Sequence, residues 1–451
     1  MSGRPSRNLR IPALDREILR LTGPAFLALV AEPLFLLADA AIVGHLGTPQ
    51  LAALGVAGAV LTTIVGLCVF LAYGTTAQVA RRIGAGDTSG AIAQGIDGIW
   101  LAVAIGVPTT LAGMVATPWL VRVFGASDAV AELAATYLRI AVVGTTPLLV
   151  LLAATGVLRG LQDTRTPLAA AVIGNVLNVV LNLALVYGIG PVPALGLRGS
   201  ALGSLLAQLA TAGILVAVVI RAARRHDARL RPDFPGIRAA AHAGVSLVVR
   251  TLTLRAALLL TLYAAAGLGG DAKLATHQLA LTIWTFLAYS LDAIAIAAQA
   301  ITGRALGAGD IEGTRRATRR MTQWGLASGV VCGLLLAAAS PWLAPLFSSD
   351  PAVHELLVPV LLIAALGQPL AGIVFVLDGV LIGAGDGRYL AASGVVVLLV
   401  YVPLALLAAT SGSLVWLWVV FSFGFMLARG AVLLHRARGT RWMVTGTTVS
   451  A

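Results

Sequence analysis

The chain has 451 residues, of which 59% are hydrophobic and 11% charged, and its formal net charge is +12. Soluble domains carry about 25% charged residues, so this composition excludes an ordinary soluble protein and indicates an integral membrane protein. The positive charge alone would also suit a nucleic-acid partner, but we expect none, because the basic residues follow the pattern of membrane loops described below.

Twelve segments are long and apolar enough to cross a bilayer, which takes roughly 20 residues of helix. In chain order, the predicted spans are 22–44, 50–73, 92–117, 131–158, 167–187, 196–222, 243–267, 276–303, 314–338, 355–383, 389–410 and 413–435. The sequence therefore predicts an all-α membrane protein with twelve transmembrane helices. We expect two six-helix lobes, residues 1–220 and 243–451, joined by a basic linker at 221–242.

Three motifs of the first half return in the second half. IGAGD at 83–87 matches LGAGD at 306–310, FGASDAVAEL at 124–133 matches FSSDPAVHEL at 347–356, and GVLRGLQD at 156–163 matches GVLIGAGD at 379–386, each 223 residues later. Six spans return the chain to the side on which it began, so the two halves have parallel topology. Internal repeats of this kind are typical of secondary transporters.

Basic residues gather at the two termini, in alternate loops and in the linker RAARRHDARLRPDFPGIR at 221–238. This distribution follows the positive-inside rule. It predicts a multi-pass protein of the cell (inner) membrane with both termini in the cytoplasm. The basic start of the chain lacks a signal-peptide cleavage pattern, so we expect the first span to be retained.

Motifs for other kinds of chemistry are missing from the sequence. There is no phosphate-binding G-x-x-x-x-G-K-[ST] loop, which favours an ion gradient over ATP as the energy source. Cys68 and Cys332 both fall within spans, and the six histidines are scattered. We therefore expect no cofactor, no metal cluster and no enzymatic activity.

Polar residues of the first half indicate a cation or proton site within the membrane. Asp39 on the first span and Asn182 on the fifth lie at matching depth, and Asn178 is one turn from Asn182. With Ser204 on the sixth span they form an oxygen-rich set suited to a proton or a small hard cation such as Na⁺. Alternatively, these groups could only hold the helices together.

Glu32 lies seven residues before Asp39, so the two share a helix face. It is a second candidate for coupling, although it precedes Pro33 and could instead form an ion pair with Arg139. For Asn175, on the same face of its helix as Asn178 and Asn182, we favour a structural bond between helices.

The second half carries different groups. Matching depth predicts two buried ion pairs, Arg250 with Asp378 and Arg255 with Asp292, which could fix helix packing or line the transport path. Trp284 and Tyr289 add aromatic surface that could stack on an amphipathic ligand or could serve ordinary packing.

Four motifs together resemble one transporter family. EPLFLLADAAIVGHLGTPQLAALGVA at 32–57, GVLRGLQDTRTPLAAAVIGNVLNVVLN at 156–182, FLAYSLDAIAIAAQAITGRALGAGD at 286–310 and FVLDGVLIGAGD at 375–386 are similar to the multidrug and toxic compound extrusion (MATE) family of the MOP superfamily, especially its DinF branch.

The resemblance implies cation coupling at Asp39, together with an asparagine and an aspartate on the fifth helix. Those two positions hold Asn178 and Asn182 here, so the second acid is absent. A single carboxylate neutralises Na⁺ poorly, and burial disfavours its charged form. This favours H⁺ over Na⁺ as the coupling ion.

The expected function is therefore a cation-coupled antiporter, most simply a monomer, that exports amphipathic drugs or metabolites. An alternative within the same superfamily is a flippase for lipid-linked precursors, which would need a basic central cavity. A membrane-embedded enzyme is a further alternative, but it would need converging catalytic groups.

Overall fold

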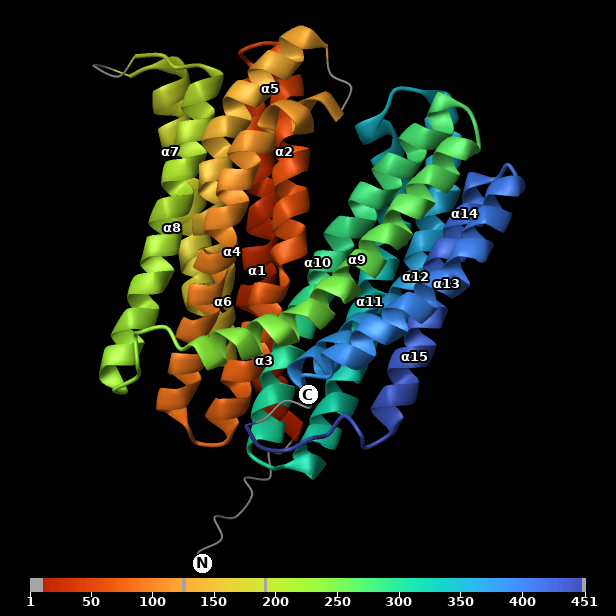
Figure 1. Ribbon diagram of the computed structural model, residues 1–451. Coiled ribbons are helices and arrows are strands. Elements are labelled where there is room, and N and C mark those ends of the chain that lie inside the picture. Colours follow the sequence, from red (N-terminus) through yellow and green to blue (C-terminus); the bar gives the residue numbers. More distant parts are fainter. Residues whose placement is uncertain (1–10, 124–126, 190–192, 448–451) are drawn as a thin grey trace, which may run out of the picture. The chain divides into compact units, whose positions relative to one another are not determined.

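The computed structural model describes residues 11–123, 127–189 and 193–447; side chains are described from residue 13 onwards. All regular elements in this part of the chain are helical, and twelve spans are long and apolar enough to cross a membrane (Figure 1). The predicted fold class is confirmed. The helices run up to eleven residues beyond the predicted spans, since the first begins at Ile11 and the second ends at Gly84.

The first six spans comprise eight α-helices and one 3₁₀ turn. They are α1 (Ile11–Gly44), α2 (Thr48–Cys68) continued by α3 (Phe70–Gly84), α4 (Thr88–Val123), α5 (Asp128–Ala141) continued through η1 (Val142–Gly144) into α6 (Thr145–Gly160), α7 (Arg165–Tyr187) and α8 (Leu197–Arg225).

The second six spans are continuous helices except for the last one, which a π-helical turn interrupts. They are α9 (Phe234–Gly267), α10 (Asp271–Gly307), α11 (Ile311–Phe347), α12 (Pro351–Gly383), α13 (Gly387–Thr410) and α14 (Leu414–Val419) continued through η2 (Val420–Phe425) into α15 (Met426–Arg438).

Helix ends repeat with the spacing of the sequence motifs. From α1 to α9 both ends shift by 223 residues, from Ile11 to Phe234 and from Gly44 to Gly267. The starts of α2 and α10, Thr48 and Asp271, differ by the same amount. The duplication therefore extends from the sequence motifs to the boundaries of the helices.

The chain forms two compact units whose division does not fall between the repeats. One unit is Leu27–Gly244, and the other joins the start of α1, up to Phe26, to Val245 and the rest of the chain. Consequently α1 and α9 each begin in one unit and continue into the other.

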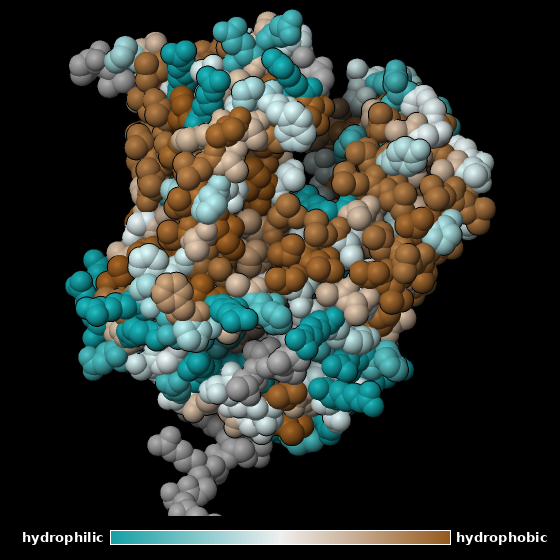
Figure 2. Space-filling view, viewed as in Figure 1, coloured by the Kyte–Doolittle hydropathy of each residue, from teal (hydrophilic) through white to brown (hydrophobic). Residues whose placement is uncertain are grey.

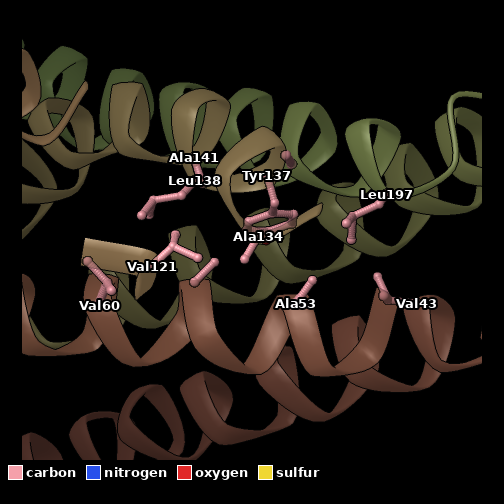
Figure 3. Packing of buried hydrophobic residues seen from close by; sticks show 11 residues of the cluster. Val43, Ala53, Val60, Val121, Ala134, Tyr137, Leu138, Ala141 and Leu197 are labelled. Atoms are coloured by element: carbon pink, nitrogen blue, oxygen red, sulfur yellow. The ribbon is translucent and has the colours of Figure 1, made fainter. Parts of the chain in front are cut away.

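Small side chains bring the helices of the Leu27–Gly244 unit together. Ala53 on α2, Ala134 on α5 and Ala201 on α8 are fully buried, and they pack with Val43, Leu138 and Leu197 (Figure 3). Outside this core, exposed side chains at mid-helix are mostly hydrophobic, and hydrophilic residues gather towards the helix ends (Figure 2). This is the surface expected of helices that contact lipid.

The segment that leads into α9 is tied to α4. Asp97 on α4 is 1% exposed and accepts hydrogen bonds from Arg229 Nη2 (2.9 Å) and from the backbone N–H of Asp233 (3.1 Å). Trp100, one turn further along α4, donates to the carbonyl oxygen of Leu230 (3.2 Å). These bonds fix the end of the linker to the first repeat.

The start of α1 is tied in the same way to α11. Arg320 donates to both carboxylate oxygens of Asp15 (2.7 and 2.8 Å), and Trp324 Nε1 donates to Asp15 Oδ1 (2.9 Å). Asp97 and Arg320 are 223 residues apart, so equivalent positions of the two repeats, with opposite charge, hold the starts of α9 and α1, although their partners Arg229 and Asp15 are not equivalent positions.

Candidate functional site

Asp39 lies in a buried polar cluster formed by α1, α7 and α8. Its carboxylate accepts hydrogen bonds from Asn182 Nδ2 and from the Ser204 hydroxyl, the latter at 3.2 Å. Asn178 Nδ2 donates to Ser204 Oγ at 3.0 Å. All four side chains are at most 5% exposed. The structure thus brings together four of the five residues predicted for coupling.

The local sequence explains this arrangement. Asn178 and Asn182 are one turn apart, so they face α1 and α8 from one side of α7. Gly203 precedes Ser204 on α8, and a Cβ atom at position 203 would overlap the Asn182 side-chain oxygen. Glycine at this position therefore permits the close approach of α7 and α8.

Two further bonds hold α7 against α1. Asn175 Nδ2 donates to the carbonyl oxygen of Ala31 at 2.8 Å, and the Tyr187 hydroxyl donates to that of Ile42 at 2.7 Å. Asn175 thus makes the interhelical bond that we expected for it. Asp39 lies between these two attachments along α1, so its position relative to α7 is well constrained.

Tyr137 on α5 also adjoins the cluster and was not among the predicted residues. It is 4% exposed and lies beside Ser200 and Ser204. In the hydrophobic core it packs beside Ala134 (Figure 3). A tyrosine among the mostly apolar residues of this span was the available signal, but no spacing rule links α5 to α1.

One polar atom of the cluster has no hydrogen-bond partner in the part of the chain that the structure describes. Asn182 Oδ1 is buried, and no donor bonds to it among the described residues. No arginine or lysine forms an ion pair with Asp39 in the described part of the chain. A buried carboxylate surrounded only by neutral groups is costly as an anion, so a proton or cation there would be favourable.

Glu32 is not part of this cluster, although it shares a helix with Asp39. Its side chain is exposed on α1, and Arg139 is exposed on α5. No ion pair joins Glu32 to Arg139 within the residues that the structure describes, so the alternative pairing considered for Glu32 is absent.

One of the two predicted ion pairs of the second half is present. Arg250 on α9 makes a bidentate pair with Asp378 on α12, through Nε at 3.1 Å and through Nη2. Arg429 on α15, which was not predicted, lies 3.6 Å from the same carboxylate. The side chains of all three residues are at most 13% exposed.

The second predicted ion pair is wrong. Arg255 is exposed, and no ion pair joins it to Asp292 in the described ranges. Arg250 and Arg255 are five residues apart on one helix, so their side chains point about 140° apart. Matching depth alone could not detect this difference in direction.

The aromatic residues of α10 have different surroundings. Trp284 packs edge-on against Phe421 of η2, with ring centroids 5.2 Å apart. Phe421 also contacts Trp418 and Phe425, so Trp284 belongs to a packed aromatic cluster. Tyr289, further along α10, is partly buried.

Comparison with known proteins identifies the family. The MatE family model matches residues 24–184 and 246–407, which is most of both repeats. The chain belongs to the MatE family. The resemblance inferred from the four motifs is thereby confirmed.

Individual MatE relatives agree with this result. Protein DETOXIFICATION 44, chloroplastic, of Arabidopsis thaliana is 32% identical over 93% of this chain and 81% of its own length. DNA damage-inducible protein F of Escherichia coli K12 is 27% identical over 66% of this chain and 64% of its own, consistent with the predicted DinF-like branch.

A solved structure has the same fold. The outward-facing conformation of a multidrug resistance MATE family transporter of the MOP superfamily superposes with a TM-score of 0.85 at 24% identity, covering 97% of this chain and 98% of that one. At this level of identity the likeness shows the fold alone.

Proposed function

We propose that this protein is a cation-coupled antiporter that exports amphipathic drugs or metabolites, with H⁺ favoured over Na⁺. Membership of the MatE family supports transport, and the name of the Arabidopsis relative points to detoxification. The observation that carries the coupling proposal is the burial of Asp39 among neutral donors, with one further oxygen of Asn182 unbonded.

In the proposed cycle, Asp39 exchanges its proton with the outside and the inside in turn. A proton taken up from outside neutralises the carboxylate and weakens its hold on Asn182 and Ser204. We propose that the resulting movement of α1 around Pro33 lowers the affinity for bound substrate, which leaves outward. Release of the proton inside restores the hydrogen bonds seen here.

We place the protein in the cell (inner) membrane as a monomer with both termini in the cytoplasm. Arginines mark the ends of α3, α8 and α15, which complete the second, sixth and twelfth spans, and the basic linker follows α8. An even number of spans returns the chain to its starting side, so these charges support one cytoplasmic face by the positive-inside rule. The termini themselves, residues 1–10 and 448–451, lie outside the described residues.

The test is transport by purified protein in proteoliposomes under separately imposed gradients. Export of the fluorescent aromatic cation ethidium should follow a pH gradient, acid on the outer side, in sodium-free buffer. A sodium gradient at equal pH should drive little export. Transport that requires sodium and ignores pH would show that the proton assignment is wrong.

A further inference from the structure

An open cavity of about 1090 Å³ lies where α13 begins and α15 ends. It is lined by Tyr389 of α13, by Ala431 and Leu434 along α15, and by the basic residues His435, Arg438 and Arg441. None of these residues belongs to the Asp39 cluster, which lies in the other unit. The coupling proposal therefore leaves this cavity unexplained.

The wall of the cavity is firmly built. Arg436 Nε donates to Asp386 Oδ2 at 2.6 Å, and its guanidinium lies 4.8 Å from the centre of the Tyr389 ring. The Tyr389 hydroxyl in turn donates to the carbonyl oxygen of Val432 at 2.6 Å. These contacts fix the start of α13 to the end of α15 and balance the charge of Arg436 with buried Asp386.

The remaining positive charge of the cavity has no such balance. Arg438 and Arg441 are exposed, and neither has an acidic partner among the described residues. No aspartate or glutamate of the described chain lines the cavity. Two arginines converging on an open cavity favour a ligand with an anionic, phosphate-like group.

An apolar stripe leads from the membrane to these arginines. Leu427, Ala431, Leu434 and Arg438 follow one another at i, i+4, i+7 and i+11, so they lie on one face of α15. Leu427 is 55% exposed and Leu434 37% exposed. Exposed leucines on a membrane helix contact hydrocarbon chains, and the stripe ends at Arg438, the last residue of the span.

We propose that this cavity binds the head group of an anionic phospholipid of the adjacent leaflet, with its acyl chains along the α15 stripe. Arg438 and Arg441 contact the phosphate, while Tyr389 and Leu434 contact the glycerol backbone and the upper part of the chains. Basic pockets between membrane helices commonly hold anionic head groups in this way. A free phosphate would use the arginines alone and leave the stripe without a role.

The experiment uses native mass spectrometry of the full-length protein in neutral detergent. Phosphatidylglycerol and phosphatidylcholine with identical acyl chains are added in turn, and the bound fraction of each is measured. We expect wild-type protein to bind phosphatidylglycerol more tightly by on the order of tenfold or more, because each basic residue near the head group contributes measurably. The double variant Arg438→Gln/Arg441→Gln should lose this preference.

The matched control is Arg224→Gln/Arg225→Gln, which removes two exposed arginines from the end of α8, the last span of the first repeat. It should keep the full preference. An equal loss in the control would show non-specific attraction and overturn the proposal. So would an unchanged preference in the cavity variant, or binding of inorganic phosphate alone as tight as that of phosphatidylglycerol.

Discussion

Asp39 is the residue on which the coupling proposal depends most directly. Asp39→Asn keeps the shape of the side chain and one acceptor oxygen for Asn182, although its amide nitrogen cannot accept the bond from Ser204, and it removes the group that can gain and lose a proton. We expect gradient-driven efflux of ethidium to be abolished in proteoliposomes, while ethidium binding in detergent persists. Asp128→Asn, an exposed aspartate at the start of α5, is the control and should transport normally.

Asn182 provides the complementary test of ion selectivity. Asn182→Asp places a second carboxylate beside Asp39, and two acidic oxygen ligands favour a hard cation more than one does. We expect sodium to stimulate efflux by the variant several-fold more than efflux by the wild type, at constant pH. Equal sodium responses in the two proteins would argue against an ion site between these residues.

Part of this site could be predicted because the membrane limits where polar groups can lie. Asp39 and Asn182 are polar residues at similar depth on helices far apart in the sequence, and depth was enough to place them together. Tyr137 was missed because it approaches from α5, and no periodicity connects that helix to α1. Glu32 shares a face with Asp39, but its exposure depends on packing that the sequence does not encode locally.

The ion pair between α9 and α12 can be tested as a unit. Removing Asp378 alone leaves Arg250 and Arg429 together without a counter-charge in a largely buried place, and leaving a buried charge unpaired typically costs about 3–5 kcal/mol. We expect Asp378→Ala to lower the melting temperature in detergent more than the double change does, because the double change leaves one unpaired arginine instead of two. Arg250→Ala should have the mildest effect, because Arg429 still faces Asp378.

A double-mutant cycle on Arg255 and Asp292 serves as the comparison. These residues form no ion pair in the described structure, so their effects should be additive. Additive losses for Arg250 and Asp378 as well would contradict the contact.

Element boundaries were predictable only where apolar stretches define them. Every predicted span corresponds to an observed helix, because burying backbone polar groups in lipid requires helix formation. The predicted spans were too short at their ends, because polar turns continue as helix beyond the apolar stretch. Examples are the turns that contain Asp15 in α1 and Arg81 and Arg82 in α3. The break at Val69 and the π-helical turn η2 left no comparable signal.

At the scale of the whole molecule, the attachments of α1 and α9 connect the repeats. Asp15→Arg places two cations together at Arg320, so we expect lower thermal stability and slower transport. Adding Arg320→Asp should restore the pair with its charges exchanged, and with it most of the stability and transport.

Recovery in the double variant should be incomplete, because Trp324 loses the carboxylate of Asp15 to which its Nε1 donates. Thermal melts in detergent and ethidium efflux in proteoliposomes measure the two effects separately. No recovery at all in the double variant would show that the ion pair itself is unimportant.

The crossing of α1 and α9 between the units also determines how such a protein can assemble from halves. If two six-span chains each packed the start of their first helix against the other copy, they would form a domain-swapped dimer. The present chain, with its two repeats fused, keeps this exchange of helix starts. In a homodimer of the first half, Asp15 would meet Asp97, the counterpart of Arg320; in a homodimer of the second half with the linker attached, Arg229 would meet Arg320. Like charges thus disfavour each half pairing with itself and favour pairing with the other half. If the two halves are expressed as separate chains, we expect these charges to favour a complex of one first half with one second half over either homodimer.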